Sequence, residues 1–214
     1  GRRIPERLQK TLMSAMGVSV LFVGVSGALS QMLRAEGGAL TVQGTMMMIL
    51  SLAVGAVLGE LLDLEDRMER FGAWLKVKTK SESDGGFIGA FVTASLTVCI
   101  GAMAIVGSIQ DGILGDHATL FAKAVLDLVI IMVMTASMGK GCIFSAIPVG
   151  ILQGSVTLLA RLLQPVFTDA ALSNLSLVGS VLVFCVGLNL VWGKKIRVAN
   201  LLPSLLIAVI WAFL

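Results

Sequence analysis

An acidic and a basic residue lie one helical turn apart inside an otherwise apolar stretch of this chain. Asp127 is the eighth residue of the stretch Leu120–Met138, which at about 1.5 Å per residue places it roughly 10 Å deep in a membrane. Lys123 lies four residues earlier, on the same helical face, where an ion pair forms readily. A charge inside hydrocarbon costs about 3 kcal/mol unless it is paired or hydrated. Asp127 is therefore either the protonatable or cation-binding group of a transport path, with Lys123 near its outer mouth, or half of a structural ion pair.

Other polar residues are candidates for the same path. Ser108, Gln110 and Asp111 precede this stretch, and Gln153 lies within the apolar stretch Cys142–Leu163. A mid-span amide needs partners that its own backbone cannot fully provide, so Gln153 is predicted to bond between helices or to bind a ligand. Most membrane Ser and Thr bond back to their own helix, which weakens the case for the remaining candidates: Thr93, Ser95, Thr97, Thr135, Ser137, Ser145, Ser155, Asn174 and Asn189.

Residues 101–108 are the segment best suited to an unwound, flexible turn. Gly101 and Gly107 flank small residues there, just before the polar group begins. Pro148 and Pro203 are two further weak points, since each frees a backbone carbonyl that can bind a cation or water. Gly101, Gly107 and Pro148 are expected to gate the path. The alternative for the glycines inside apolar stretches is close helix packing.

Catalytic, redox and metal-binding patterns are missing from the sequence. Cys99, Cys142 and Cys185 lie in or beside apolar stretches without a CxxC spacing, which is typical of packing residues. The segment from Ser108 to His117 contains the single histidine but lacks the regularly spaced acids of a calcium loop. No HExxH, GxSxG or Ser/His arrangement occurs. The sequence therefore predicts no enzyme, no cofactor and no metal site.

The elements that position these residues are seven apolar stretches. Each is near the ~20 residues that cross about 30 Å of hydrocarbon, and they run from Thr11 to Leu33, Thr45 to Leu62, Phe87 to Val106, Leu120 to Met138, Cys142 to Leu163, Ala171 to Trp192 and Val198 to Leu214. With 57% hydrophobic and 14% charged residues, the chain has too little polar surface for a soluble globule. We expect an all-α, polytopic transmembrane helix bundle of seven spans, forming one domain over residues 1–214.

Basic residues are concentrated in every second polar segment. Basic loops stay in the cytoplasm, so this alternation predicts that residue 1 is cytoplasmic and the C-terminus lies outside. The net charge of +3 then faces anionic lipid on one membrane side rather than a nucleic acid. The alternation rests on 13 of the 16 basic residues: Arg2, Arg3, Arg7, Lys10, Arg67, Arg70, Lys76, Lys78, Lys80, Lys140, Lys194, Lys195 and Arg197.

The longest polar segment is predicted to form an amphipathic helix over about residues 64–80. Leu64, Met68, Phe71 and Leu75 share one helical face, which basic residues flank. Such a helix lies in the inner headgroup region, anchored here by Trp74. The alternative is that it docks to a partner or to another part of this protein.

A weak internal similarity relates the first and sixth stretches. Five positions match when Leu12 to Ala28 is aligned with Leu175 to Val191. The charge rule makes these two spans run in opposite directions, so a true repeat would be inverted, as in many secondary transporters. Small residues on several spans are also consistent with a homodimer.

Three segments resemble a known family. They are the opening Gly1 to Leu8, the run Gly101 to Gly112, and Phe144 to Gly150 followed by Gln153 and Gly154. The chain resembles, over nearly its whole length, the bacterial membrane proteins grouped as domain-of-unknown-function family 554, also labelled YdfK or YqgA proteins. The resemblance implies a multi-pass protein of the bacterial cytoplasmic membrane. Members usually carry an apolar segment before the opening basic run, which implies an eighth span; for function, only a candidate role in transport follows.

Two functions follow from these patterns. The first is a transporter or channel for a small solute or ion, with a polar path near Asp127 and a gate at residues 101–108. Cations are favoured because the deepest charged group is acidic. The alternative is a non-transporting membrane scaffold or sensor, in which the Asp127/Lys123 pair is structural and the 64–80 helix meets a cytosolic partner.

Overall fold

The computed structural model describes residues 6–36, 39–80, 85–99, 102–163, 165–166 and 168–214. Apolar residues with high helix propensity fill most of the chain, and α-helices dominate these ranges. The elements are α1 (Glu6–Met32), β1 (Leu33–Glu36), β2 (Ala39–Val42), α2 (Thr45–Leu62), α3 (Leu64–Lys78), α4 (Phe87–Cys99), α5 (Ala102–Leu114), α6 (Ala118–Met138), the 3₁₀ helix η1 (Lys140–Ser145), α7 (Ala146–Leu158), α8 (Ala160–Leu163), α9 (Asp169–Trp192), the 3₁₀ helix η2 (Val198–Leu201) and α10 (Pro203–Trp211).

Helices of membrane-crossing length confirm the polytopic helical class. Four described segments are long and apolar enough to span a bilayer: Thr45–Leu62, Ala118–Met138, Lys140–Leu162 and Asp169–Trp192. Three shorter apolar helices follow: Gly17–Met32, Phe87–Cys99 and Val198–Trp211. Helices occupy the seven expected stretches, but the third, Phe87 to Val106, is not a single helix: α4 ends at Cys99 and α5 begins at Ala102. The number of spans stays a prediction.

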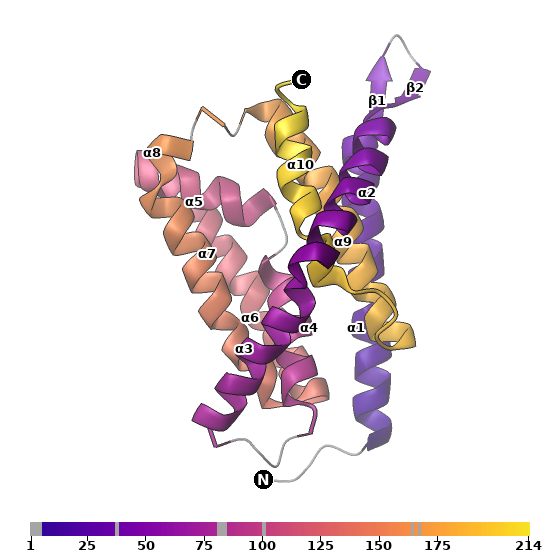
Figure 1. Cartoon of the computed structure of the whole chain (residues 1–214), viewed down its shortest axis with the longest axis vertical. Coiled ribbons are helices and arrows are strands. Elements are labelled where there is room, and N and C mark those ends of the chain that lie inside the picture. Colours follow the sequence, from indigo (N-terminus) through magenta and orange to yellow (C-terminus); the bar gives the residue numbers. More distant parts are fainter. Residues whose placement is uncertain (1–5, 37–38, 81–84, 100–101, 164, 167) are drawn as a thin grey trace.

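The helices form two groups that lie side by side (Figure 1). The first group contains α1, α2, α9 and α10, with α1 and α9 packed along each other. The second group contains α3 to α8, in which α4 contacts α3, α6, η1 and α7. A shared apolar core joins the groups, since Met47, Phe87 and Leu182 from α2, α4 and α9 belong to one buried cluster.

The outward faces of the helices are apolar, as the core is. On α6, Phe121, Val125 and Leu128 are 69%, 61% and 59% exposed and share one helical face. Exposing such a continuous apolar surface to water is unfavourable, whereas lipid tails solvate it. These faces are those that a membrane protein presents to the bilayer.

A two-stranded hairpin corrects the expectation of a purely helical chain. Strands β1 and β2 pair antiparallel, with Leu33 opposite Val42 and Glu36 opposite Ala39, and the hairpin projects beyond α1 and α2 (Figure 1). Each strand has four residues, too few to give a clear two-residue periodicity in the sequence.

Two helical hairpins share one local design. In α6–η1–α7 and α9–η2–α10, a helix ends at a glycine, Gly139 (φ 104°) or Gly193 (φ 80°), and a 3₁₀ helix follows. Only glycine adopts these angles without strain. Both hairpins run downward and then back upward in Figure 1. The expected inverted repeat of α1 and α9 stays a prediction.

Candidate functional site

A cavity of about 410 Å³ lies between the two helix groups, and we call it the vestibule. Its walls come from α3, α4, the end of α6, α9 and η2. It is bounded by Gly86 just before α4 and by Val198 in η2. Mostly apolar side chains line it, and its polar groups are Glu65, Glu69, Thr93, Ser137, Asn189 and Lys194.

Two carboxylates and one ammonium group form the charged wall of the vestibule. Glu65 is only 4% exposed, and Lys194 Nζ lies 2.9 Å from Glu65 Oε1 while also pairing with Glu69. The other oxygen of Glu65 accepts the Ala199 backbone N–H at 3.0 Å. A buried carboxylate needs such partners, so Glu65 is satisfied. The Glu69 side chain is 42% exposed and pairs with Lys194 through one of its two oxygens.

A polar network fixes this wall to the corner between α2 and α3. Asn200, 2% exposed, accepts the Glu65 backbone N–H and donates to Glu60 Oε2, both at 2.7 Å. Arg197 donates to Glu60 at 2.8 Å and to Asp63 at 2.7 Å. Asn200 thus forms hydrogen bonds with both α2 and α3, which lie far from it in the sequence. These bonds hold η2 against both helices.

The charges of this network are unbalanced. Four carboxylates (Glu60, Asp63, Glu65 and Glu69) pair with two cations, Lys194 and Arg197. Partial burial lowers the pKa of Lys194, but its hydrogen bonds to Glu69 and Glu65 outweigh this effect, so the net pKa is raised. The ammonium stays charged at neutral pH, and the network keeps a formal excess of negative charge.

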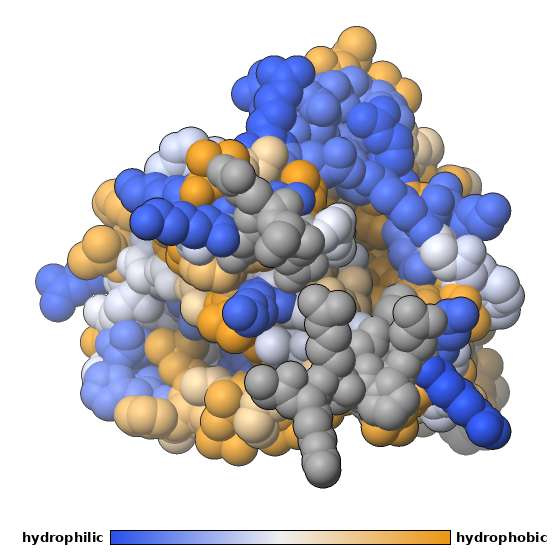
Figure 2. All heavy atoms as spheres, turned by 90° about the horizontal axis from the view of Figure 1, so that it is seen from below, coloured by the Kyte–Doolittle hydropathy of each residue, from blue (hydrophilic) through white to orange (hydrophobic). Residues whose placement is uncertain are grey.

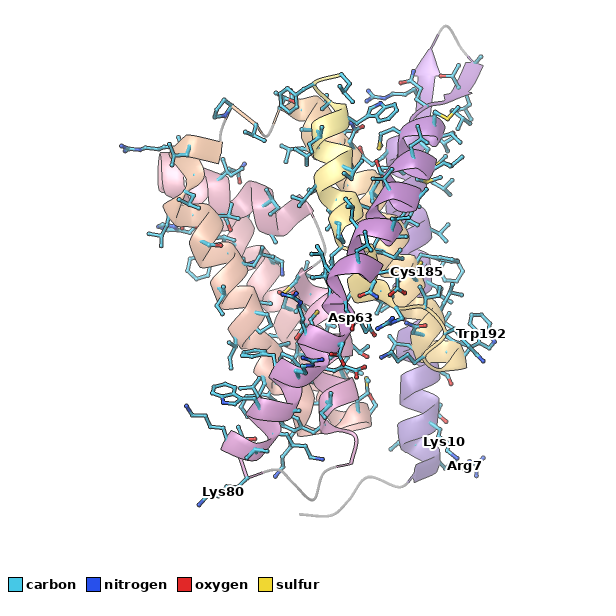
Figure 3. The ribbon with its side chains drawn as sticks, viewed as in Figure 1. Arg7, Lys10, Asp63, Lys80, Cys185 and Trp192 are labelled. Atoms are coloured by element: carbon cyan, nitrogen blue, oxygen red, sulfur yellow. The ribbon has the colours of Figure 1, made fainter. Side chains whose placement is uncertain are left out.

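The vestibule lies toward the end of the molecule that carries the N-terminal basic residues. Arg7, Lys10 and Lys80 lie at this lower end, whereas Asp63 lies near mid-height (Figure 3). Seen from below, hydrophilic residues gather on this face, with apolar residues between them (Figure 2). A polar solute at this end therefore meets a charged surface first.

A second cavity, which we call the chamber, has a volume of about 260 Å³. Leu96 of α4 lines both the chamber and the vestibule. Ser95 is 1% exposed, and its hydroxyl has no hydrogen-bond partner among the described residues. The chamber is lined by Met68, Ser95, Leu96, Cys99, Pro148, Leu152, Leu202 and Leu205.

The expected ion pair of Lys123 and Asp127 is present on α6. Lys123 Nζ pairs with Asp127 and donates to the Val98 carbonyl at 2.9 Å, near the end of α4. The two side chains are 8% and 21% exposed. Lys123 thus satisfies a carbonyl of the last helical turn of α4. Neither residue lines the vestibule or the chamber.

The other predicted path residues are dispersed rather than gathered around Asp127. Gln110 accepts a hydrogen bond from Thr119 at 2.7 Å, and Asp111 pairs with His117, so both hold the connection from α5 to α6 together. Ser108 donates to its own helix, to the Ala104 carbonyl at 2.7 Å. Gln153 is half-buried on α7 and lines neither cavity.

The prediction of an unwound turn over residues 101–108 is wrong for residues 102–108. Helix α5 begins at Ala102, and a Cβ on Gly107 would touch Leu120 at 3.0 Å, so this glycine serves packing. Gly101 lies outside the described residues. Pro148 is in the first turn of α7 and Pro203 begins α10, where a missing N–H costs little. The prolines therefore mark helix starts, and Pro148 also lines the chamber.

The acidic face of α3 escaped the sequence analysis. The predicted amphipathic helix exists as Leu64–Lys78, and its Gly72 packs against Phe91 of α4. Glu65 and Glu69 are four residues apart on this helix, a spacing that puts two acids on one face and was available in the sequence. Three of the polar candidates do reach the vestibule, namely Thr93, Ser137 and Asn189.

Comparison with known proteins places these features in a wider group. A family model described as "Protein of unknown function (DUF554)" matches residues 1–213. The chain is 30% identical to the uncharacterized membrane protein YdfK of Bacillus subtilis over 204 residues, covering 95% of this chain and 83% of that protein. It is 28% identical to the uncharacterized protein YqgA of Escherichia coli over 211 residues, covering 97% and 85%. No solved structure matches.

Proposed function

Because the chain belongs to the DUF554 family of proteins of unknown function, we propose its function from its own geometry: it carries a small solute across the membrane, with cations favoured. The observation that supports this proposal is the vestibule between the two helix groups, with Glu65, Glu69 and Lys194 in its wall. A concave site with few, convergent polar groups is the usual form of a ligand site.

The charge of the vestibule favours a cation. Glu65 and Glu69 share a single cation, Lys194, so one negative charge is left uncompensated. The partly exposed Glu69 is the group that an entering cation meets.

This proposal moves the cation-selective group from Asp127 to Glu69. Lys123 pairs with Asp127, and neither residue lines the vestibule or the chamber. Direct participation of Asp127 in transport, with Gln110, Asp111 and Gln153, stays a prediction. The pair fits the role of a strut that holds α6 against the end of α4.

We further propose that the vestibule opens to the cytoplasm of a bacterial cell. Arg7, Lys10 and Lys80 lie at the same end of the molecule (Figure 3), and basic segments are retained on the cytoplasmic side. The C-terminus lies at the opposite end (Figure 1), which would then face outward.

Flux measurements in vesicles test this proposal. The purified chain is reconstituted in liposomes, and the influx of Na⁺, K⁺ and tetramethylammonium is followed. We expect at least one cation to cross faster than in protein-free liposomes, and Glu69→Gln to slow it severalfold. Asp66→Asn is the matched control, because Asp66 is an acid on α3 that pairs with Arg70 outside the vestibule. Equal leakage with and without protein would contradict transport.

A second candidate function is favoured by the outer face of α3. Trp74 is 52% exposed, stacks on Phe71 at 5.7 Å and lies under Lys78 Nζ at 4.8 Å. Exposed aromatic and basic side chains are typical of membrane-surface helices and of interfaces. A scaffold or sensor that uses this face would show no flux, and a Trp74→Ala change would weaken its contact with lipid or with a partner.

A further inference from the structure

The chamber differs from the vestibule in that no charged side chain lines it. We propose that the chamber is a binding site for a small, largely apolar molecule that carries one hydrogen-bonding group. This inference does not depend on the proposed transport path. It concerns binding in a separate cavity and is tested without any measurement of flux.

The hydroxyl of Ser95 is the first observation. Buried serines of membrane helices usually bond to a carbonyl one turn earlier, as Ser108 and Ser137 do in this chain. Ser95 is 1% exposed and has no such partner among the described residues. Buried polar groups without a partner are rare and call for an explanation. A bound molecule with one donor or acceptor supplies the missing partner.

The apolar wall is the second observation. Met68, Leu152, Leu202 and Leu205 come from α3, α7 and the start of α10, and they line the chamber beside α4. A buried water needs two to four polar partners, which this wall does not offer. An ion would lose its hydration without compensation. A neutral molecule with a short apolar body and one polar group would pack against the leucines and form a hydrogen bond with Ser95.

The volume of the chamber limits the size of the ligand. Sites for drug-sized ligands have volumes of about 300–1,000 Å³, and the chamber, at about 260 Å³, is smaller. Leu96 lines both the chamber and the vestibule. Met68 is unbranched and flexible, so it adapts to ligands of slightly different shape.

Native cysteines provide a direct test. Cys99 lines the chamber, whereas Cys185 on α9 lies outside it. The full chain in detergent is treated with methyl methanethiosulfonate, with and without 1-hexanol, and each cysteine is followed by peptide mass spectrometry. We expect 1-hexanol to slow modification of Cys99 severalfold and to leave Cys185 unchanged. n-Hexane, which lacks the hydroxyl, should protect Cys99 less.

Two variants separate the chamber from general effects of the alcohol. Ser95→Ala should reduce protection by 1-hexanol to the level of n-hexane, and Leu152→Trp should fill the chamber and slow modification without any alcohol. Equal slowing of Cys99 and Cys185, or full protection in Ser95→Ala, would overturn the proposal. If Cys99 does not react in the free protein, binding is tested instead by the midpoint of thermal unfolding with and without 1-hexanol. A rise with 1-hexanol in the parent but not in Leu152→Trp supports the site, and no rise overturns it.

Discussion

At the scale of single residues, the two buried charged side chains of the described residues, Lys123 and Glu65, each have a charged and a backbone partner. Lys123 reaches both Asp127 and the Val98 carbonyl, and Glu65 reaches both Lys194 and the Ala199 N–H. Removing one member of a buried pair leaves the other charge uncompensated. These pairs therefore hold helices in place, and their loss should be measurable as lost stability.

The Lys123/Asp127 pair gives the first prediction. Asp127→Asn leaves the buried ammonium of Lys123 with one carbonyl partner, so the free energy of unfolding should fall by about 3 kcal/mol. Denaturation in mixed micelles measures this fall. The double variant Lys123→Met/Asp127→Leu removes both charges and should recover part of the loss. A variant with parental stability but no flux would return Asp127 to the transport path.

Lys194 gives a pH dependence. Its pKa is raised above 10.5 in the folded protein by Glu69 and Glu65. The stability that these bonds contribute is complete below the unfolded pKa and is lost as the pH rises through the higher folded pKa. The unfolding midpoint should therefore fall as the pH is raised above 10.5, and it should fall less in Glu65→Gln/Glu69→Gln. A parallel fall in both proteins would exclude this pair as the cause.

At the scale of elements, glycines set how closely the helices approach. A Cβ built on Gly59 of α2 would overlap the carbonyl oxygen of Asn200 in η2, and one on Gly24 of α1 would lie 2.6 Å from the Phe184 backbone of α9. Rigid backbone cannot yield as a flexible side chain does. The close contact between α2 and η2 thus depends on the absence of a side chain at Gly59. This contact brings the residues of the polar network together.

Gly59→Ala tests this dependence. The added methyl group must push η2 away from α2, so the free energy of unfolding should fall by about 2–3 kcal/mol. Gly154→Ala on α7 is the matched control, because nothing lies within 4 Å of a Cβ at that position. This control should be neutral or slightly stabilising, since alanine favours helix. Equal thermal midpoints for the two variants would argue against a close contact at Gly59.

Element positions were largely predictable, and their breaks were not. Helix α2 occupies the expected stretch Thr45–Leu62, because long apolar segments in lipid must satisfy their backbone as helices. The glycines near residue 101 indicated a weak point, but the sequence could not show that residues 102–108 resume a helix. The helical conformation of these residues depends on the packing of α5 against α6, which is a tertiary contact.

At the scale of the whole molecule, the two ends differ in charge. Arg7, Lys10 and Lys80 lie at one end and the C-terminus at the other (Figures 1 and 3). The proposed orientation follows from this difference, because basic segments are retained on the cytoplasmic side. The hairpin β1–β2 lies at the same end as the C-terminus (Figure 1).

Cysteine labelling of intact cells tests the threading. Lys80→Cys should be protected from a membrane-impermeant maleimide until the cells are lysed, whereas Thr41→Cys in the hairpin and Leu214→Cys should react from outside. The native cysteines lie within helices or are buried, so they serve as the background in the unmodified chain. Labelling of positions 80 and 214 from the same side would contradict the proposed orientation.

The sequence by itself determined the class of this protein and the approximate places of most helices, and its i, i+4 spacing allowed the pairing of Lys123 with Asp127. Each depends on residues within a few positions of one another, where helical periodicity and lipid solvation act locally. Only the tertiary structure decided the vestibule, the chamber and the network around Asn200. Glu65 and Asn200 are 135 positions apart, and no local pattern indicates that their helices meet. Glu65, which in the sequence is one acid on a polar helix, becomes the buried centre of the site because α3 folds back against α4 and η2.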